Sequence, residues 1–173
     1  MFKKLILFIL KPLSFLPALA MMVLIFSFSA QNGTTSSQLS YRASHKIVEI
    51  GNYVLDKNLE DWQIDAYAER IEGPVRKLAH MTEYFILAIA VALPFYVYGL
   101  RGFPLLFVAG IICVGFACTD EYHQSLVAGR GPSLRDICID SIGVFFGITL
   151  VRIVCWTALA PARALSRRKR SAR

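Results

Sequence analysis

Residues 119–147 read TDEYHQSLVAGRGPSLRDICIDSIGVFFG, and this stretch decides the fold. Two apolar helical segments meet here at a polar turn. The turn and its flanks concentrate ionisable and amide side chains, namely Asp120, Glu121, His123, Gln124, Arg130, Arg135, Asp136 and Asp140. An ionisable side chain at a bilayer boundary is costly unless it is paired or hydrated. We therefore expect these residues to form a functional site.

The rest of the chain has the composition of a membrane protein, because 55% of its 173 residues are hydrophobic. A helix needs about 20 residues to cross about 30 Å of hydrocarbon, and backbone groups in lipid must be hydrogen-bonded within the helix. The sequence predicts an all-α membrane protein, a four-helix transmembrane bundle with short amphipathic outer helices. The predicted spans are residues 13–30, 78–98, 103–119 and 137–160.

The net charge of +7 indicates membrane orientation rather than nucleic-acid binding. Basic residues precede the first span, occur at Arg101 between the second and third spans, and follow the fourth, whereas all twelve acidic residues lie between Glu49 and Asp140. Cytoplasmic loops carry an excess of Lys and Arg. We therefore expect a multi-pass protein of the inner (cytoplasmic) membrane with both termini in the cytoplasm, a transmembrane domain at 1–160 and a basic cytoplasmic tail at 161–173. No aromatic-interleaved basic surface accompanies the charge, so no nucleic-acid partner is expected.

Residues 31–73 form an outer segment in this topology. Leu39, Ala43 and Ile47 recur at helical spacing, which is typical of an amphipathic helix. A second short helix is expected at 61–71, and Gly73-Pro74 is expected to begin the second span, since proline is well tolerated at the first helical position. Two interpretations remain open: the segment lies on the outer leaflet, or it covers the polar site as a lid.

The last three spans each have a polar outer end. His80 and Glu83 share one face of the second span. In the third and fourth spans small residues on one face lead to polar ones, and small residues allow close helix packing in lipid. These faces are Gly110, Cys113, Ala117, Asp120 and Gln124 in the third span, and Asp136, Asp140, Gly143 and Gly147 in the fourth. The sequence predicts close packing of the third and fourth spans and convergence of the polar ends.

A turn at 128–132 connects these two spans. Ser133 and Asp136 after it match a capping box, in which each side chain satisfies a backbone N–H of the other residue. Asp136 is therefore expected to cap the fourth span, either as its sole role or together with a role in the site.

Three interpretations of the cluster remain open. In the first, cationic side chains bind the phosphate or carboxylate of an envelope amphiphile, because a guanidinium matches such an anion with two hydrogen bonds. The candidate ligand-binding residues are Lys77, Gln124, Arg130, Arg135, Asp136 and Asp140.

In the second interpretation, acid–base or divalent-metal groups make the protein a hydrolase or transferase. The catalytic candidates are His80, Glu83, Asp120, Glu121 and His123. No zinc spacing such as H-E-x-x-H occurs, so neither a metal nor another cofactor is expected. In the third interpretation the charges only pair with one another, His80 with Glu83 or Asp120 and Arg130 with Asp136, and fix the register of a structural bundle.

The motifs also resemble a known family. KLAHMTEY at 77–84, TDEYHQSLVAGRGPSLRD at 119–136, DSIGVFFG at 140–147 and FSFSAQ at 26–31 are similar to the VanZ-like family of bacterial membrane proteins. The resemblance implies a role in the cell envelope, since the founding member accompanies glycopeptide (teicoplanin) resistance, and it implies no settled activity. The positions carried over are Lys77, His80, Glu83, Tyr84, Asp120, Glu121, His123, Gln124, Arg130, Asp136 and Gly143.

We therefore expect an integral membrane protein whose outward-facing polar site binds or handles a cell-envelope molecule. The expected partners are membrane lipids and a lipid-linked or glycopeptide-like ligand. Two alternatives remain: a membrane-embedded hydrolase or transferase acting on a lipid-linked precursor, and a structural helix bundle or partner subunit. The sequence leaves the oligomeric state open.

Overall fold

The computed structural model describes residues 11–131 and 133–171, with side chains up to residue 158. These residues form the helices α2 (Leu16–Ser29), α3 (Gly33–Leu55), α4 (Asp61–Val97), α5 (Gly102–Ser125) and α6 (Leu134–Ser171), with no strand among them. Within this part of the chain four stretches are long and apolar enough to cross a membrane: Lys11–Ser29, Asp61–Val97, Gly102–Ser125 and Leu134–Ala158. The predicted four-span helical membrane fold is confirmed. The side chains of the predicted basic tail lie outside the described residues.

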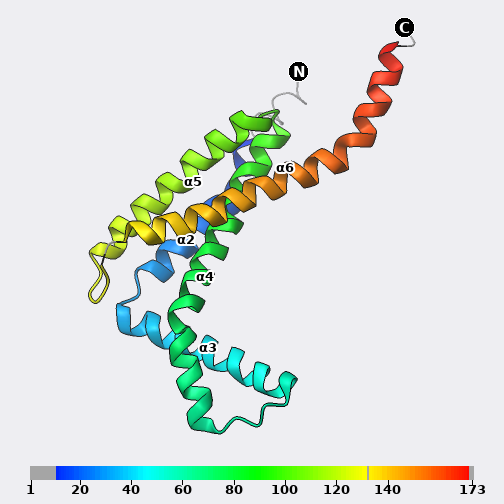
Figure 1. Ribbon diagram of the computed structural model, residues 1–173. Helices are drawn as coiled ribbons and strands as arrows, with labels where there is room; N and C mark the ends of the chain where they lie inside the picture. The colour runs from blue at the N-terminus through cyan, green and yellow to red at the C-terminus, as the bar shows by residue number, and fades with distance from the viewer. Residues whose placement is uncertain (1–10, 132, 172–173) are drawn as a thin grey trace.

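The four spanning helices pack around one apolar core (Figure 1). Each contributes fully buried side chains, such as Ile25 of α2, Leu87 of α4, Ala109 of α5 and Ile148 of α6. We call the end of the bundle where α2 and α5 finish and α6 begins the polar end. Large apolar side chains elsewhere on the bundle surface, such as Phe107, are exposed, as lipid contact requires.

Helix α4 is longer than predicted, because it runs without a break from Asp61 through Gly73-Pro74 to Val97. The prediction of a separate helix at 61–71 and of a helix start at Gly73-Pro74 is wrong. The start is a capping box at Glu60, whose backbone N–H donates to the Gln63 side chain at 3.0 Å. An interior proline removes one backbone hydrogen bond, and here the packing of α3 along this half of α4 offsets the loss.

Helix α3 and the first half of α4 form a hairpin that projects from the polar end of the bundle (Figure 1). Asn32 caps α3 by accepting a hydrogen bond from the Thr35 backbone N–H at 2.8 Å. The amphipathic helix predicted from the spacing of Leu39 and its neighbours is therefore present. Its contact face is polar near its start, where Ser37 and Ser40 accept hydrogen bonds from Arg76 of α4.

The glycine pair of α6 packs against α4. A Cβ atom at Gly147 would lie 2.5 Å from the Phe85 carbonyl oxygen and 2.9 Å from the Ala88 Cβ, and one at Gly143 would collide with the Met81 carbonyl oxygen. Glycine at both positions therefore permits backbone contact between the second and fourth spans. The prediction that this face brings the third and fourth spans together is wrong.

The buried face of α5 is the predicted one at Cys113, Ala117 and Asp120 and differs from it at Gly110. Gly110 has open space around it, whereas Ala109, Cys113 and Ala117 are buried in the core. Leu105, Ala109, Cys113 and Ala117 follow one another at spacings of four residues and define this buried face. Gly110 consequently lies beside it, on a surface groove together with Phe107 and Ile111.

Gly147, which contacts α4, and Gly115, which contacts nothing nearby, provide a test. Alanine at the two positions should change the free energy of unfolding in different directions. Gly147→Ala should lower the free energy of unfolding in detergent by about 1–3 kcal/mol, because the new methyl group overpacks the contact with α4. Gly115→Ala, where nothing lies within 4 Å, should be neutral or stabilising, because alanine favours the helix. Thermal unfolding of both variants measures the difference. Equal effects would contradict the close α4–α6 contact.

Candidate functional site

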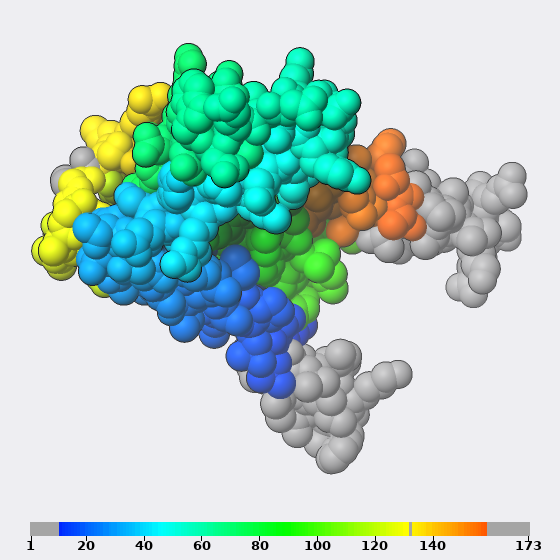
Figure 2. Space-filling model, turned by 90° about the horizontal axis from the view of Figure 1, so that it is seen from below, coloured from blue at the N-terminus to red at the C-terminus, as the bar shows by residue number. Residues whose placement is uncertain are grey.

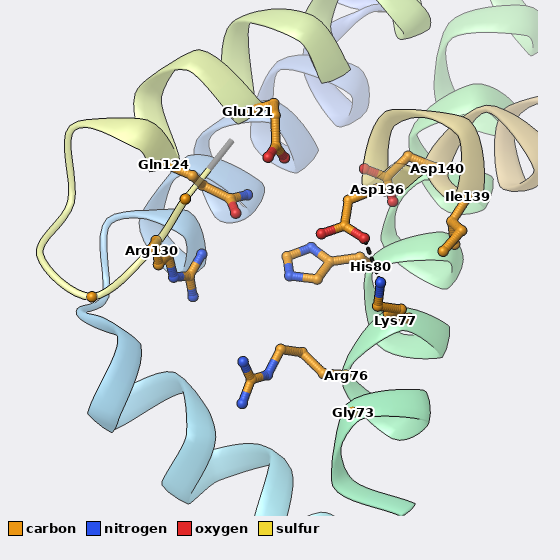
Figure 3. A pocket seen from close by; sticks show the side chains of 12 residues that line it. Gly73, Arg76, Lys77, His80, Glu121, Gln124, Arg130, Asp136, Ile139 and Asp140 are labelled. Carbon is orange, nitrogen blue, oxygen red and sulfur yellow. Dashed lines mark hydrogen bonds and ion pairs between the residues drawn. The ribbon is translucent and has the colours of Figure 1, made fainter. Parts of the chain in front are cut away.

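A cavity of about 240 Å³ lies at the polar end, between α4, the end of α5, the α5–α6 loop and the start of α6 (Figure 3). Its lining brings together seven of the residues predicted for the site: Lys77, His80, Glu121, Gln124, Arg130, Asp136 and Asp140. It also includes residues that the sequence analysis did not select: Gly73, Arg76, Gly129, Gly131 and Ile139.

The loop that carries Arg130 is fixed to two neighbouring elements. The Gly33 backbone N–H donates to the Ala128 carbonyl oxygen at 3.1 Å, and a Cβ atom at Gly33 would lie 2.5 Å from the Gly129 carbonyl oxygen. Gly129 has φ +78°, a left-handed conformation that favours glycine. Figure 2 shows this loop, in yellow, beside the end of α2 and the start of α3. These contacts hold Arg130 at the edge of the cavity nearest to α3.

The Arg130 side chain has no hydrogen bond or ion pair among the described residues. Burial lowers the pKa of its guanidinium, and the positive charge of Arg76 lowers it further. The negative charges of Asp120 and Glu121 raise this pKa in part, but the net shift is downward, so the folded protein disfavours the charge on Arg130 relative to water. The cavity therefore holds a cation that nothing in the described protein neutralises directly.

Arg76 provides the second guanidinium of the cavity. Its Nε donates to Ser40 Oγ at 3.2 Å, its Nη2 donates to Ser37 Oγ at 2.6 Å, and it pairs with Glu72. Figure 3 shows the Arg76 and Arg130 side chains extending into the same open space. Arg76 was not among the residues predicted for the site, although it lies four residues before His80 and hence on the same helical face.

The α6 side of the cavity carries an ion pair between Lys77 Nζ and Asp136 Oδ1, at 2.7 Å. Only half of the predicted capping box forms: the Asp136 N–H donates to Ser133 Oγ at 3.3 Å, while the Ser133 N–H donates to Glu121 instead of Asp136. Because Glu121 takes over this capping role, the Asp136 carboxylate is available to Lys77. The predicted pairing of Asp136 with Arg130 is not observed.

His80 lies at the centre of the cavity (Figure 3). Its Nδ1 is 3.4 Å from Glu83 Oε2, so of the two predicted partners of His80, Glu83 and Asp120, the structure pairs it with Glu83. Asp140 is only 7% exposed, and its Oδ1 has no hydrogen-bond partner in the described part of the chain. No three His, Cys, Asp or Glu residues among those described group closely enough to hold a metal ion.

The remaining predicted residues lie outside this cavity. Asp120 is 1% exposed and accepts hydrogen bonds from Ser29 Oγ at 2.8 Å and Gln124 Nε2 at 2.9 Å, which ties α2 to α5. The His123 ring packs on Phe26 with 5.3 Å between the ring centroids. Arg135 is exposed on the surface of α6.

A second cavity of about 210 Å³ adjoins the first between α3 and α4. Arg76, His80 and Arg130 line both cavities, and Glu83 lines only the second. The site is therefore a pair of cavities that meet at two guanidinium groups and an imidazole.

These contacts predict different roles for two carboxylates. Asp120→Ala should lower the free energy of unfolding by about 1–3 kcal/mol, because it leaves the Ser29 hydroxyl and Gln124 amide without their buried acceptor. Asp136→Ala removes a half-exposed ion pair and should cost about 1 kcal/mol or less. Thermal unfolding of both variants measures which one loses more stability. A larger loss in Asp136→Ala than in Asp120→Ala would contradict the structural role of Asp120.

Comparison with curated proteins and with solved structures gives no match. The sequence pattern of the VanZ/LLP1 family, in contrast, matches residues 14–155. The matched region is well over half of the chain and contains every residue that lines the two cavities. The chain therefore belongs to the VanZ/LLP1 family.

Proposed function

We propose that the cavity at the polar end binds the phosphate or carboxylate group of a cell-envelope molecule. The observation that carries this proposal is the Arg130 guanidinium, which extends into the cavity opposite Arg76 without an ion-pair partner in the described residues. A partly buried cation beside a second cation is unfavourable in the empty site. An anion bound between the two would remove that cost.

The geometry of the two arginines suits such a ligand. Arg76 uses one edge of its guanidinium on Ser37, Ser40 and Glu72 and thereby has a fixed orientation. Its Nη1 has no hydrogen-bond partner among the described residues and is available to an anion. Arg130 can donate two parallel hydrogen bonds to an oxyanion, and Arg76 can add a hydrogen bond from Nη1.

The charge distribution supports an outward-facing site in an inner membrane. The short loop at the opposite end contains Arg101, and all acidic residues lie on the polar-end side of it or within the spans. By the positive-inside rule the polar end would face away from the cytoplasm, where envelope precursors are exposed. This orientation is compatible with the glycopeptide (teicoplanin) resistance that the VanZ-like resemblance implies.

A second candidate function is hydrolysis or group transfer on the bound molecule. It rests on the position of His80, whose ring lies in the cavity beside Glu83 and between the arginines and the carboxylates of α6. An imidazole oriented by a carboxylate is a common general acid–base arrangement. In this case the arginines would hold the anionic group while His80 transfers a proton.

Arg130→Lys tests the proposal because it keeps the charge and removes the two-pronged donor. We expect the affinity for methyl phosphate, measured by titration calorimetry in nanodiscs, to fall about tenfold, the loss expected for one charge-assisted hydrogen bond. Thermal stability should stay near the wild-type value. Arg135→Lys is the matched control, since Arg135 is exposed outside the cavity. Wild-type affinity in Arg130→Lys, or equal losses in both variants, would contradict the proposal.

Cysteine labelling tests the orientation. In a variant whose four native cysteines are replaced by serine, Thr35→Cys should react with a membrane-impermeant maleimide in intact cells. Ser171→Cys should react only after the membrane is opened, because an excess of basic residues favours the cytoplasmic side for this end. Reaction of both from the same side would refute the proposed topology.

A further inference from the structure

We propose that the ligand is a single-chain amphiphile whose phosphate lies between Arg76 and Arg130 and whose hydrocarbon chain occupies the second cavity. This inference rests on the proposed anion-binding function and extends it from the head group to the chain. A free phosphate or a water-soluble phosphate ester would use only the first cavity.

The first support is the division of polarity between the two cavities. The accessible lining of the second cavity is mostly apolar and includes Phe28, Leu39, Ala43, Val75 and Ala79, although Gln31, Ser36, Ser40 and Glu83 also line it. The guanidinium groups of the second cavity are those of Arg76 and Arg130, which it shares with the first cavity. An amphiphile has the same arrangement, with its charge at one end of an apolar chain.

The second support is where the apolar cavity opens. Leu39 and Ala43 of α3 and Ala79 of α4 are exposed side chains, although they line the cavity. The cavity thus reaches the side of the molecule between α3 and the second span. A chain that resides in the bilayer could enter there while its phosphate stays at the polar end.

The third support is size. Cavities that bind small molecules usually have about 300–1,000 Å³. Each of the two cavities, at about 240 and 210 Å³, is smaller than that range, and their combined volume falls within it. A ligand that fills both cavities therefore matches the space better than one confined to either.

The hydrogen-bond donors of the two guanidiniums indicate which head group the site would bind. A phosphate monoester carries close to two negative charges at neutral pH and has three acceptor oxygens. Arg130 and the Nη1 group of Arg76 can share these oxygens, although Arg76 is also paired with Glu72, as Lys77 is with Asp136 at 2.7 Å. We therefore expect a terminal phosphate, whose three acceptor oxygens can receive hydrogen bonds from both arginines at once.

The test compares ethyl phosphate with decyl phosphate as ligands of the wild-type protein in nanodiscs, with titrations into empty nanodiscs subtracted. Decyl phosphate should bind at least about tenfold more tightly. Ala79→Phe and Ala43→Phe, which fill the second cavity from its two walls, should each remove this advantage and leave ethyl phosphate affinity unchanged. Ala66→Phe is the matched control, because Ala66 is an exposed alanine of α4 outside both cavities, and it should behave as wild type.

The outcomes separate the two proposals. If ethyl phosphate and decyl phosphate bind with equal affinity, or if Ala79→Phe and Ala43→Phe act like Ala66→Phe, the proposal that the second cavity holds the hydrocarbon chain is refuted. The proposed anion-binding function is then unaffected. If neither phosphate binds, or if Arg130→Lys leaves their binding unchanged, the proposed function itself fails. Chain-dependent binding that both filling variants abolish supports the inference.

Discussion

The close contact between α6 and α4 is the constraint on which the site depends. Gly143 and Gly147 let the α6 backbone rest on the carbonyl groups of Met81 and Phe85. One and two turns earlier along the same face of α6 come Asp140 and Asp136, which this contact places beside His80 and Lys77 of α4. A larger side chain at either glycine would move the acidic half of the cavity away from its basic partner.

The opposite half of the cavity is held by contacts of another kind. The loop bearing Arg130 is fixed by the backbone contact of Gly33 with Ala128 and Gly129, and Arg76 is oriented by the serines of α3. Glu72 pairs with Arg76, whereas the described residues provide no ion-pair partner for Arg130. The contacts with α3 thus hold the Arg130 and Arg76 guanidiniums close together although their charges repel. Binding sites for charged ligands commonly accept such a cost in stability.

The sequence was sufficient for the four spans and for most of the cavity lining, because hydropathy and helical periodicity determine which residues share a face. It failed where partners depend on tertiary packing. Gly73-Pro74 has the local pattern of a helix start, yet α3 supports a continuous helix through it. The glycine pair indicates close packing without naming the neighbour, which is α4. Arg76 was missed because its role depends on α3, and Asp120 was placed in the site although it joins α2 to α5.

The most direct test of the anion site is the unfolding temperature of Arg130→Gln with and without inorganic phosphate. Burial and the charge of Arg76 lower the pKa of Arg130 in the folded protein. When no anion is bound, the charge of Arg130 therefore opposes folding at every pH below that lowered pKa. Removing the charge should therefore leave stability equal or higher in phosphate-free buffer, and phosphate should stabilise only the wild-type protein. A destabilised Arg130→Gln variant together with a wild-type protein indifferent to phosphate would show that Arg130 supports the scaffold instead.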